Sequence, residues 1–393
     1  MASIVQRNKS FAVVYQIKTQ ERTKQKWETY HSKEDAEKRK WEIENVPEFV
    51  GLSPKLTTIS DLIEEYLNLY SRQKWSFSTY TTRTSLLNRY ILPQIGTVSL
   101  NYVSGHFLSR YFAKLIESEQ HITTGVIYGI YKLLRNIFNQ AVYWGIYENN
   151  PIAHVAISKP ISKPLDILSS KQIFHLIKTT SKDDSLLSLA VQMSFVGSLR
   201  KGELCALCWD DIDFENKCVY INKELLRVSN KSIRALSEKN ILHMFPPLKT
   251  GSKSRLVIKT PKTSASTRKV YLPKSLLDEL SKWRTIQHNT NVLSNENDFI
   301  FTNEKGYPSQ PDCINKMLSS ALAICDLPHV VFHSLRHSSS TYKLLISGGD
   351  IKSVQGDNGH AKPDMVLNVY AHILDEQRKE IADQMEKMFY LKL

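Results

Sequence analysis

Residues 332–337 read Phe-His-Ser-Leu-Arg-His. This stretch carries two imidazoles and a guanidinium. Gly359-His360 follows it, and Tyr370 lies ten residues beyond that histidine. Upstream, cations recur in Arg200-Lys201-Gly202-Glu203 and Pro261-Lys262-Thr263. Such cations can surround a phosphodiester while a phenol attacks it, so we predict a phosphoryl-transfer site.

The charged groups of this set match the charge that develops during phosphodiester cleavage. Attack on phosphorus places negative charge on the non-bridging oxygens, which the guanidiniums of Arg200 and Arg336 can bind bidentately. His360 completes the cage as a hydrogen-bond donor. Glu203 lies three residues after Arg200, so their side chains meet if the segment is helical. We therefore predict Glu203 as a supporting residue.

The proton transfers of the same reaction need three further side chains. A tyrosine has a reference pKa near ~10, so Tyr370 needs positive charge nearby and a proton acceptor, for which His333 is suited. The leaving 5′ oxygen must be protonated, and Lys262 is suited to that role. A phosphotyrosyl link keeps the energy of the broken bond, so rejoining needs no ATP.

Length and charge limit the class of protein. The chain has 393 residues, 41% of them hydrophobic, so we expect two or three folded domains. Its 52 Lys and Arg outnumber 39 Asp and Glu, and the net charge of +13 favours nucleic acid or an anionic membrane surface as partner. No apolar run is long enough to span a membrane, and the start lacks a signal-peptide core, so we expect a cytoplasmic protein without a membrane partner.

Zinc sites fit the sequence poorly. His333 and His337 have the spacing of a zinc-binding helix, but Ser334 stands where that motif has its glutamate. Cys205 and Cys208 form a C-x-x-C pair with no second pair to complete a site. We interpret the five cysteines as reduced thiols.

Other cofactor-dependent chemistry has equally little support. A nuclease-type metal site would use paired carboxylates such as Asp210, Asp211 and Asp213, but this triplet is more simply a turn and cap between a helix and a strand. The sequence has no Gly-x-x-x-x-Gly-Lys-Ser/Thr loop for a nucleotide. We expect no metal and no cofactor.

The first fifty residues are predicted to form a small β domain. Residue types favour strands over Ser3–Arg7, Phe11–Lys18 and Lys24–Tyr30, and Ser32 caps a helix that ends near Asn45. The strands carry a basic edge, which is either a DNA-groove surface or a solvated edge protected from aggregation. Its candidate DNA-binding residues are Arg7, Lys9, Lys18, Lys24 and Lys26.

A second region, from Ile59 to about Ile152, is predicted to be all-helical because apolar residues recur at helical spacing. Lys74 and Arg83 lie near the start of its second helix, where they suit phosphate contacts. A purely structural helix bundle explains the pattern equally well. Proline-containing linkers at 46–55 and 158–164 flank this region.

The C-terminal region is predicted to be mostly helical. A buried helix covers Leu189–Leu207, and Arg255–Lys259 and Arg268–Pro273 form a hairpin with its turn at Thr263–Ser266 and Lys262 at or beside the tip. The excess of basic residues between 219 and 269 favours a DNA-facing surface over a solvated loop. Further elements are predicted at Ser275–Gln287, Phe299–Phe301, Ile314–Leu322, His333–Ser347, Asp350–Val354 and Pro363–Ile373, with an amphipathic tail over Asp375–Tyr390.

Arg-x-Gly-Glu, a hairpin lysine, His-x-x-Arg, Gly-His and a later tyrosine, in this order, resemble the tyrosine recombinase (phage integrase) family, closest to conjugative-transposon integrases. The resemblance covers the whole chain. It implies a site-specific recombinase of a mobile element that cleaves and rejoins DNA through a 3′-phosphotyrosyl intermediate, for integration and excision. The catalytic residues that it implies are Arg200, Lys262, His333, Arg336, His360 and the nucleophile Tyr370.

The resemblance also implies a multidomain α+β fold. Its parts are a three-stranded arm-site DNA-binding domain with a helix (1–50), a helical, SAM-like core-binding domain (57–155), and a mostly α catalytic domain with β-hairpins (166–393). The implied partners are double-stranded DNA, at core and arm attachment sites, and further copies of the chain in a homotetramer on DNA. An excisionase and a host DNA-bending protein are candidate accessory partners.

Three details qualify the resemblance. Asn358 stands where many members have leucine before Gly-His, and Ser198 stands where glycine is common. Neither change removes a reactive group. The basic stretch Val219–Thr260 resembles an insertion that contacts DNA or a neighbouring subunit.

Two other functions remain open from the sequence. A type IB topoisomerase shares the catalytic core, but relaxation of DNA needs no second class of DNA site, which disfavours it. A catalytically idle DNA-binding protein is disfavoured by the intact reactive set.

Overall fold

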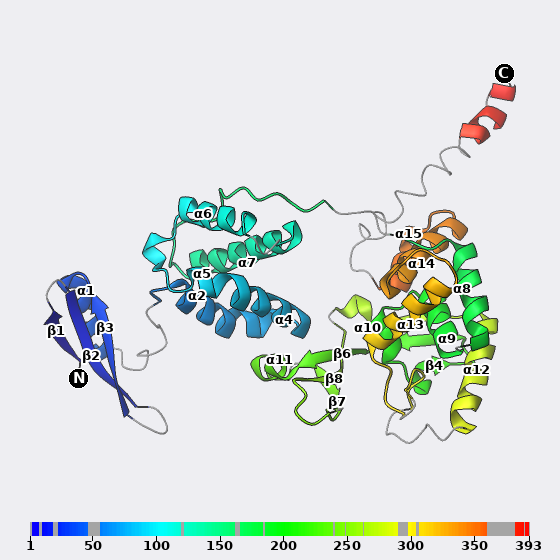
Figure 1. Ribbon diagram of the computed structural model, residues 1–393, viewed down its shortest axis with the longest axis horizontal. Coiled ribbons are helices and arrows are strands. Elements are labelled where there is room, and N and C mark those ends of the chain that lie inside the picture. Colours follow the sequence, from blue (N-terminus) through cyan, green and yellow to red (C-terminus); the bar gives the residue numbers. More distant parts are fainter. Residues whose placement is uncertain are drawn as a thin grey trace. The chain divides into compact units, whose positions relative to one another are not determined.

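The computed structural model consists of helices and small antiparallel sheets (Figure 1). The residues that it describes are 2–7, 10–18, 23–45, 56–118, 122–161, 166–183, 185–238, 240–247, 249–261, 263–289, 298–303, 306–359, 382–388 and 390–392. Two compact units result, one of residues 1–71 and 83–160 and one of residues 72–82 and 161–393. None of the helices in the described ranges is long and apolar enough to cross a membrane.

The N-terminal sheet has the predicted strands to within one residue. Its elements are β1 (Ser3–Arg7), β2 (Ser10–Lys18) and β3 (Thr23–Tyr30), paired antiparallel in that order, and the helix α1 (Lys33–Asn45). Ser32 caps α1 as predicted, because its Oγ accepts from the backbone N of Asp35 at 3.1 Å. Alternate residues of β2 point to one face, so Val13 and Tyr15 are buried together with Ala36.

The second predicted region is helical from Ile59 to Tyr143, short of the predicted limit near Ile152. Its elements are α2 (Ile59–Glu65), a π-helix at Tyr66–Ser71, α3 (Arg72–Lys74), α4 (Phe77–Leu86), a π-helix at Leu87–Ile91, α5 (Leu92–Ile95), a 3-10 turn at Leu100–Tyr102, α6 (Gly105–Ile116) and α7 (Thr124–Tyr143). A capping box starts α2, in which Thr58 Oγ1 accepts from Asp61 N (3.2 Å) and Asp61 accepts from Thr58 N (2.9 Å).

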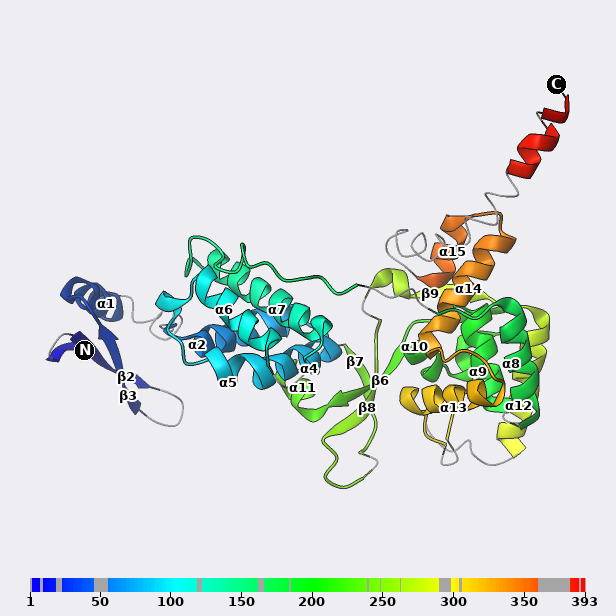
Figure 2. The same ribbon diagram turned by 45° about the horizontal axis from the view of Figure 1, so that its top comes forward.

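Most helices of the second unit lie around α9 or next to it (Figure 2). They are α8 (Ser170–Asp183), α9 (Ser185–Val196), α10 (Lys201–Cys205), α12 (Lys274–Asn289), α13 (Pro311–Ile324), α14 (Phe332–Ile346) and α15 (Ile351–Asn358). Helix α9 is buried on most of its sides. The predicted helices at 275–287, 314–322, 333–347 and 350–354 are thus confirmed. The segment Phe299–Phe301 forms only an isolated bridge, from Cys208 to Phe299.

The predicted continuous helix over Leu189–Leu207 is wrong. Helix α9 ends at Val196, Ser198 takes a left-handed conformation with φ 54°, and α10 begins at Lys201. A left-handed residue cannot continue a right-handed helix, so the chain turns there. This turn moves Arg200 from a helix interior to the start of a new helix.

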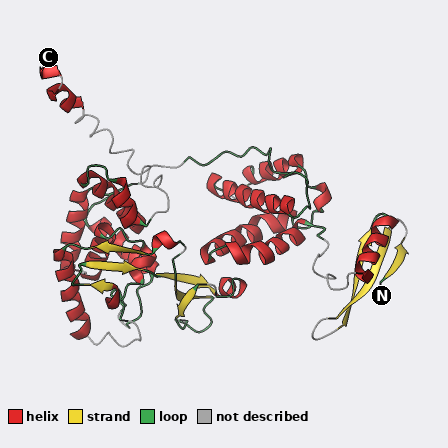
Figure 3. Ribbon diagram, turned by 180° about the vertical axis from the view of Figure 1, so that it is seen from behind, coloured by secondary structure: helices red, strands yellow, loops and turns green. Residues whose placement is uncertain are grey.

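The second unit holds two three-stranded sheets, of which one lies among its helices and the other extends from them beside α11 (Asn230–Ala235) (Figure 3). One has the order β4 (Ile212–Asp213), β5 (Cys218–Ile221), β9 (Arg268–Tyr271), and the other has the order β6 (Glu224–Ser229), β8 (Ser254–Lys259), β7 (Ile241–Met244). The predicted hairpin between β8 and β9 is therefore wrong, although both strands exist. Strand β9 pairs with β5 because this buries Val270 directly opposite Val219, and a 3-10 turn at Ser264–Ser266 separates β8 from β9.

The sheet β6–β8–β7, with α11 (Asn230–Ala235), accounts for most of the basic stretch that resembles an insertion. One face of it packs against Phe77 and Tyr80, which belong to the same compact unit. Thr81 Oγ1 lies 2.8 Å from Ser232 Oγ at this contact. Part of the insertion surface is thus covered by the chain itself.

Candidate active site

Arg200 and Glu203 meet at the start of α10, as their spacing predicted. Glu203 is buried, and its Oε1 accepts from Arg200 Nη1 at 2.6 Å while its Oε2 accepts from the backbone N of Arg200 at 2.9 Å. The carboxylate therefore holds both the side chain and the main chain of Arg200. It does so as a helix cap, with Arg200 in extended conformation just before the helix.

Arg268 on β9 is a second cation on the same carboxylate, and it was absent from the predicted site. Its Nη1 and Nη2 donate to the two oxygens of Glu203 at 3.1 and 2.9 Å. Burial by itself raises the pKa of Glu203, but the hydrogen bonds and charges of Arg268 and Arg200 lower it below its usual range. Glu203 is thus an ionised carboxylate that pairs with two guanidiniums.

One feature of the sequence could have identified Arg268. It lies two residues before Val270 on a strand, so both side chains face the same side of the sheet, and Val270 belongs to the core. A basic residue on a buried face needs a buried acceptor. Arg268 also donates from Nε to the backbone oxygen of Asp357 at 2.6 Å and from Nη2 to that of Ser198 at 3.3 Å, so it joins three segments.

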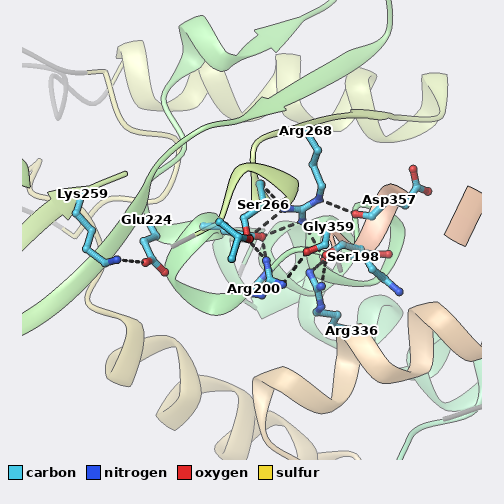
Figure 4. Close-up of polar contacts among 12 residues, drawn as sticks. Ser198, Arg200, Glu224, Lys259, Ser266, Arg268, Arg336, Asp357 and Gly359 are labelled. Carbon is cyan, nitrogen blue, oxygen red and sulfur yellow. Dashed lines mark hydrogen bonds and ion pairs between the residues drawn. The ribbon is translucent and has the colours of Figure 1, made fainter. Parts of the chain in front are cut away.

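Arg336 and Arg200 bind the backbone oxygens of two consecutive residues at the C-terminal end of α15. Arg336 Nη2 donates to the backbone oxygen of Asn358, and Arg200 Nη2 donates to that of Gly359 at 3.2 Å. Arg336 Nη1 also donates to the backbone oxygen of Ser198 at 2.6 Å. Burial and the positive charge of Arg200 lower the pKa of Arg336 to about 9, so its guanidinium stays charged at neutral pH. The structure thus brings the two predicted phosphate-binding arginines together (Figure 4).

Gly359 fits this position for steric reasons. Its φ of 58° is left-handed, and a Cβ there would lie 2.7 Å from the backbone oxygen of Ala265 and 3.0 Å from Cδ of Arg268. The close approach of these segments therefore requires glycine. The residue that follows, His360, lies outside the described residues, as do Lys262 and Tyr370.

His333 lies one turn before Arg336 on α14 and keeps an exposed edge. Partial burial of the ring, the neighbouring His337 and the charges of Arg336 and Arg200 lower the pKa of His333 to about 4. The rings of His333 and His337 meet edge to face with centroids 4.7 Å apart. His333 is therefore a neutral imidazole at neutral pH and can accept a proton.

Two residues of the acidic triplet cap turns, and the Cys-x-x-C pair is buried. Asp211 accepts from the backbone N of Cys208 at 2.8 Å and pairs with Lys223, and Asp213 accepts from the backbone N of Asn216, as a turn with caps requires. Cys205 and Cys208 are buried free thiols, and burial raises the pKa of Cys208 to about 11. Within the described ranges, no group of three or more His, Cys, Asp or Glu could hold a metal ion.

Among the candidate DNA-binding residues whose side chains are described, Arg7 and Lys74 are exposed, and Lys26 and Arg83 are half-buried. The guanidinium of Arg7 lies over the ring of Trp27 at 4.8 Å, Lys26 is 3.6 Å from Glu28, and Lys74 ends α3. Arg83 lies on α4. Lys9 and the side chains of Lys18 and Lys24 lie outside the described residues.

We expect Arg268→Met to lower the free energy of unfolding of the second unit by about 3–5 kcal/mol, because it removes one partner of a buried ion pair. Chemical denaturation followed by circular dichroism measures this loss. The matched control is Lys201→Met, which breaks the more exposed pair with Asp312 and should cost at most about 1 kcal/mol. Equal losses in both variants would contradict the role of Arg268.

Comparison with known proteins adds a family assignment to this geometry. Residues 166–377, more than half of the chain, match the Phage integrase family, and residues 58–115 match the description "Phage integrase, N-terminal SAM-like domain". All the motif residues lie in the first of these segments, and the second contains Lys74 and Arg83.

Individual relatives cover most of the chain. It is 25% identical over 373 residues to the tyrosine recombinase XerC-like protein of Caldanaerobacter subterraneus subsp. tengcongensis, covering 91% of this chain and 90% of the relative. It is 26% identical over 301 residues to the ICEBs1 integrase of Bacillus subtilis, covering 73% and 75%. Its fold is similar to that of the Tn1549 transposon integrase, solved in complex with transposon right end DNA, with a TM-score of 0.66, 21% identity and coverage of 84% and 99%.

Proposed function

Because the chain belongs to the phage integrase family of tyrosine recombinases, we propose that it integrates and excises a mobile element by cleaving and rejoining double-stranded DNA. The family resemblance and the mixed helix and sheet fold predicted from the sequence are confirmed. The observation that carries the proposal is the convergence of Arg200 and Arg336 on the consecutive carbonyls of Asn358 and Gly359. Two charged guanidiniums at one point are suited to a phosphodiester.

The proposed reaction is a transesterification by Tyr370. Its phenolic oxygen attacks the phosphorus, the bond to the 5′ oxygen breaks, and a 3′-phosphotyrosyl link and a free 5′ hydroxyl remain. His333 accepts the phenolic proton, because its imidazole is unprotonated at pH 7. Lys262 protonates the leaving oxygen. Attack by a 5′ hydroxyl of the partner strand reverses these steps and joins the exchanged strands.

The cations of the site have a different task in this proposal. Arg200, Arg336 and His360 bind the non-bridging oxygens, where negative charge increases in the transition state. Glu203 touches no substrate but holds Arg200 in place through two hydrogen bonds. Each terminal nitrogen of a guanidinium has two N–H groups, so donation to a backbone carbonyl leaves one for a phosphate.

We infer three functional regions along the chain. Residues 1–50 would bind arm sites, 57–155 core sites, and 166–393 would carry out catalysis on the core sites. The net charge of +13 and the exposed Arg7 and Lys74 support a DNA partner. A homotetramer on DNA, an excisionase and a host DNA-bending protein complete the proposed assembly.

The chemistry proposed here needs neither metal nor ATP. Purified protein incubated with DNA of the host genome in the presence of EDTA and without ATP should form a protease-sensitive covalent adduct. Sequencing the trapped ends then identifies the cleavage sites. Loss of the adduct on adding the chelator would show that a metal takes part and would overturn this mechanism.

A second readout separates recombination from DNA relaxation. Supplied with two DNA duplexes that carry the trapped sites, a recombinase yields products whose strands have exchanged partners. Loss of supercoils without exchange would instead support a type IB topoisomerase. Binding without any adduct would support a catalytically idle DNA-binding protein.

A further inference from the structure

Both terminal nitrogens of Arg336 depend on backbone oxygens that lie outside regular secondary structure or at its end. Nη1 donates to Ser198, in the turn between α9 and α10, and Nη2 donates to Asn358, the last residue of α15. Ser198 is left-handed, with φ 54°, which is uncommon for a residue other than glycine. The position of the Arg336 guanidinium therefore depends on how firmly the backbone at Ser198 and Asn358 is held in place.

The side chains of the same two residues bind back to α14. Ser198 Oγ lies 2.7 Å from Ser339 Oγ, and Asn358 Nδ2 donates to Ser340 Oγ at 2.8 Å. Ser340 Oγ also donates to the backbone oxygen of Arg336 at 2.9 Å. Each acceptor of the guanidinium is thus attached a second time to the helix that carries it.

Helical geometry explains why this arrangement works. Ser339 and Ser340 lie three and four positions after Arg336, so their side chains share its face of α14. Arg336, the two serines and their partners Ser198 and Asn358 are each at most 2% exposed, so water does not compete for their hydrogen bonds. Two closed rings result, one through Ser198 and one through Asn358, each beginning and ending on the same helix.

We propose that Ser339 and Ser340, acting through Ser198 and Asn358, are positioning residues that set the guanidinium of Arg336 for transition-state binding. This role rests on the proposed function. Neither Ser339 nor Ser340 needs to contact DNA to fulfil the positioning role. Ser198 and Asn358 each use the backbone oxygen to hold Arg336 and the side chain to bind a serine of α14.

The sequence contains a matched control, because three serines follow one another on α14. Ser338 is as buried as its two neighbours, but its Oγ accepts from the backbone N of Leu168 at 3.0 Å, away from the acceptors of Arg336. Ser338→Ala therefore removes one buried hydrogen bond of similar kind. It should lower stability without changing the rate of the chemical step.

The test measures single-turnover adduct formation on a duplex that carries a trapped cleavage site. We expect Ser339→Ala/Ser340→Ala to slow the reaction about 10–100-fold at saturating DNA, because a displacement of an ångström or less at a reacting group costs rate on this order. The apparent Kd for DNA should not change, and Ser338→Ala should react like the wild type. The single variants serve if the double variant does not fold, as judged by its thermal melting.

A second substrate distinguishes a displaced Arg336 guanidinium from a general loss of structure in the active site. Replacing a non-bridging oxygen of the scissile phosphate by methyl removes the charge that Arg336 neutralises, so the wild type and the serine variant should react at closely similar rates on it. The positioning role would be overturned if the serine variant still reacted more slowly than the wild type on the methylphosphonate. Equal rates of the variant and the wild type on ordinary DNA would overturn it as well. If the wild type itself formed no adduct, the proposed function would be wrong, and the positioning role that rests on it would be wrong too.

Discussion

Tyr370→Phe is expected to abolish the covalent protein–DNA adduct completely while leaving DNA affinity unchanged. Phenylalanine keeps the ring but lacks the oxygen that would bond to phosphorus, so the proposed phosphotyrosyl link cannot form. Denaturing gel electrophoresis of protein with labelled cleavage-site DNA measures the adduct, and a mobility shift measures binding. This is the largest effect that the proposed mechanism predicts.

The chain offers a matched control for this variant. Tyr342 lies on α14 close to His333 and Arg336 in sequence, is partly exposed and takes no part in the proposed reaction. Tyr342→Phe should retain the adduct. An adduct of normal yield in Tyr370→Phe, or mass spectrometry that placed the nucleotide on another side chain, would show that the nucleophile is assigned wrongly. Loss of DNA binding in that variant would point to a structural role instead.

Arg200→Ala should slow adduct formation by about 10²–10³-fold, the usual effect of removing one donor to a developing oxyanion. The substitution also leaves the carboxylate of Glu203 with Arg268 as its remaining cation, so the fold should be retained. Arg200→Lys keeps the charge but not the planar pair of donors, and we expect an intermediate rate. Single-turnover rates at saturating DNA separate these effects from binding.

Arg284→Ala is the control for loss of a guanidinium elsewhere in the same unit. Arg284 is exposed on α12 and lies over the ring of Trp209 at 5.5 Å, away from the proposed site. It should react at the wild-type rate. If Arg200→Ala did so too, Arg200 would have to be removed from the proposed phosphate-binding set.

Most elements of the fold could be predicted because their causes are local. The β-branched and aromatic runs of β1 to β3 act within a few residues, and the structure places these strands within one residue of the predicted bounds. The apolar spacing in the predicted helical region is likewise local, and α7 lies within that region. The contact of Arg200 with Glu203 followed from a separation of three residues. The proposed catalytic set itself came from residue types and family motifs, which need no coordinates.

Most helices and strands, the excess of basic residues and the order of the reactive side chains could be predicted from the sequence. Only the tertiary structure decided that β9 pairs with β5, that Arg268 shares Glu203 with Arg200, and that Ser339 and Ser340 bind Ser198 and Asn358. These contacts join segments from 18 to 141 residues apart. Which such segments meet depends on how the whole core packs, and no local pattern encodes it.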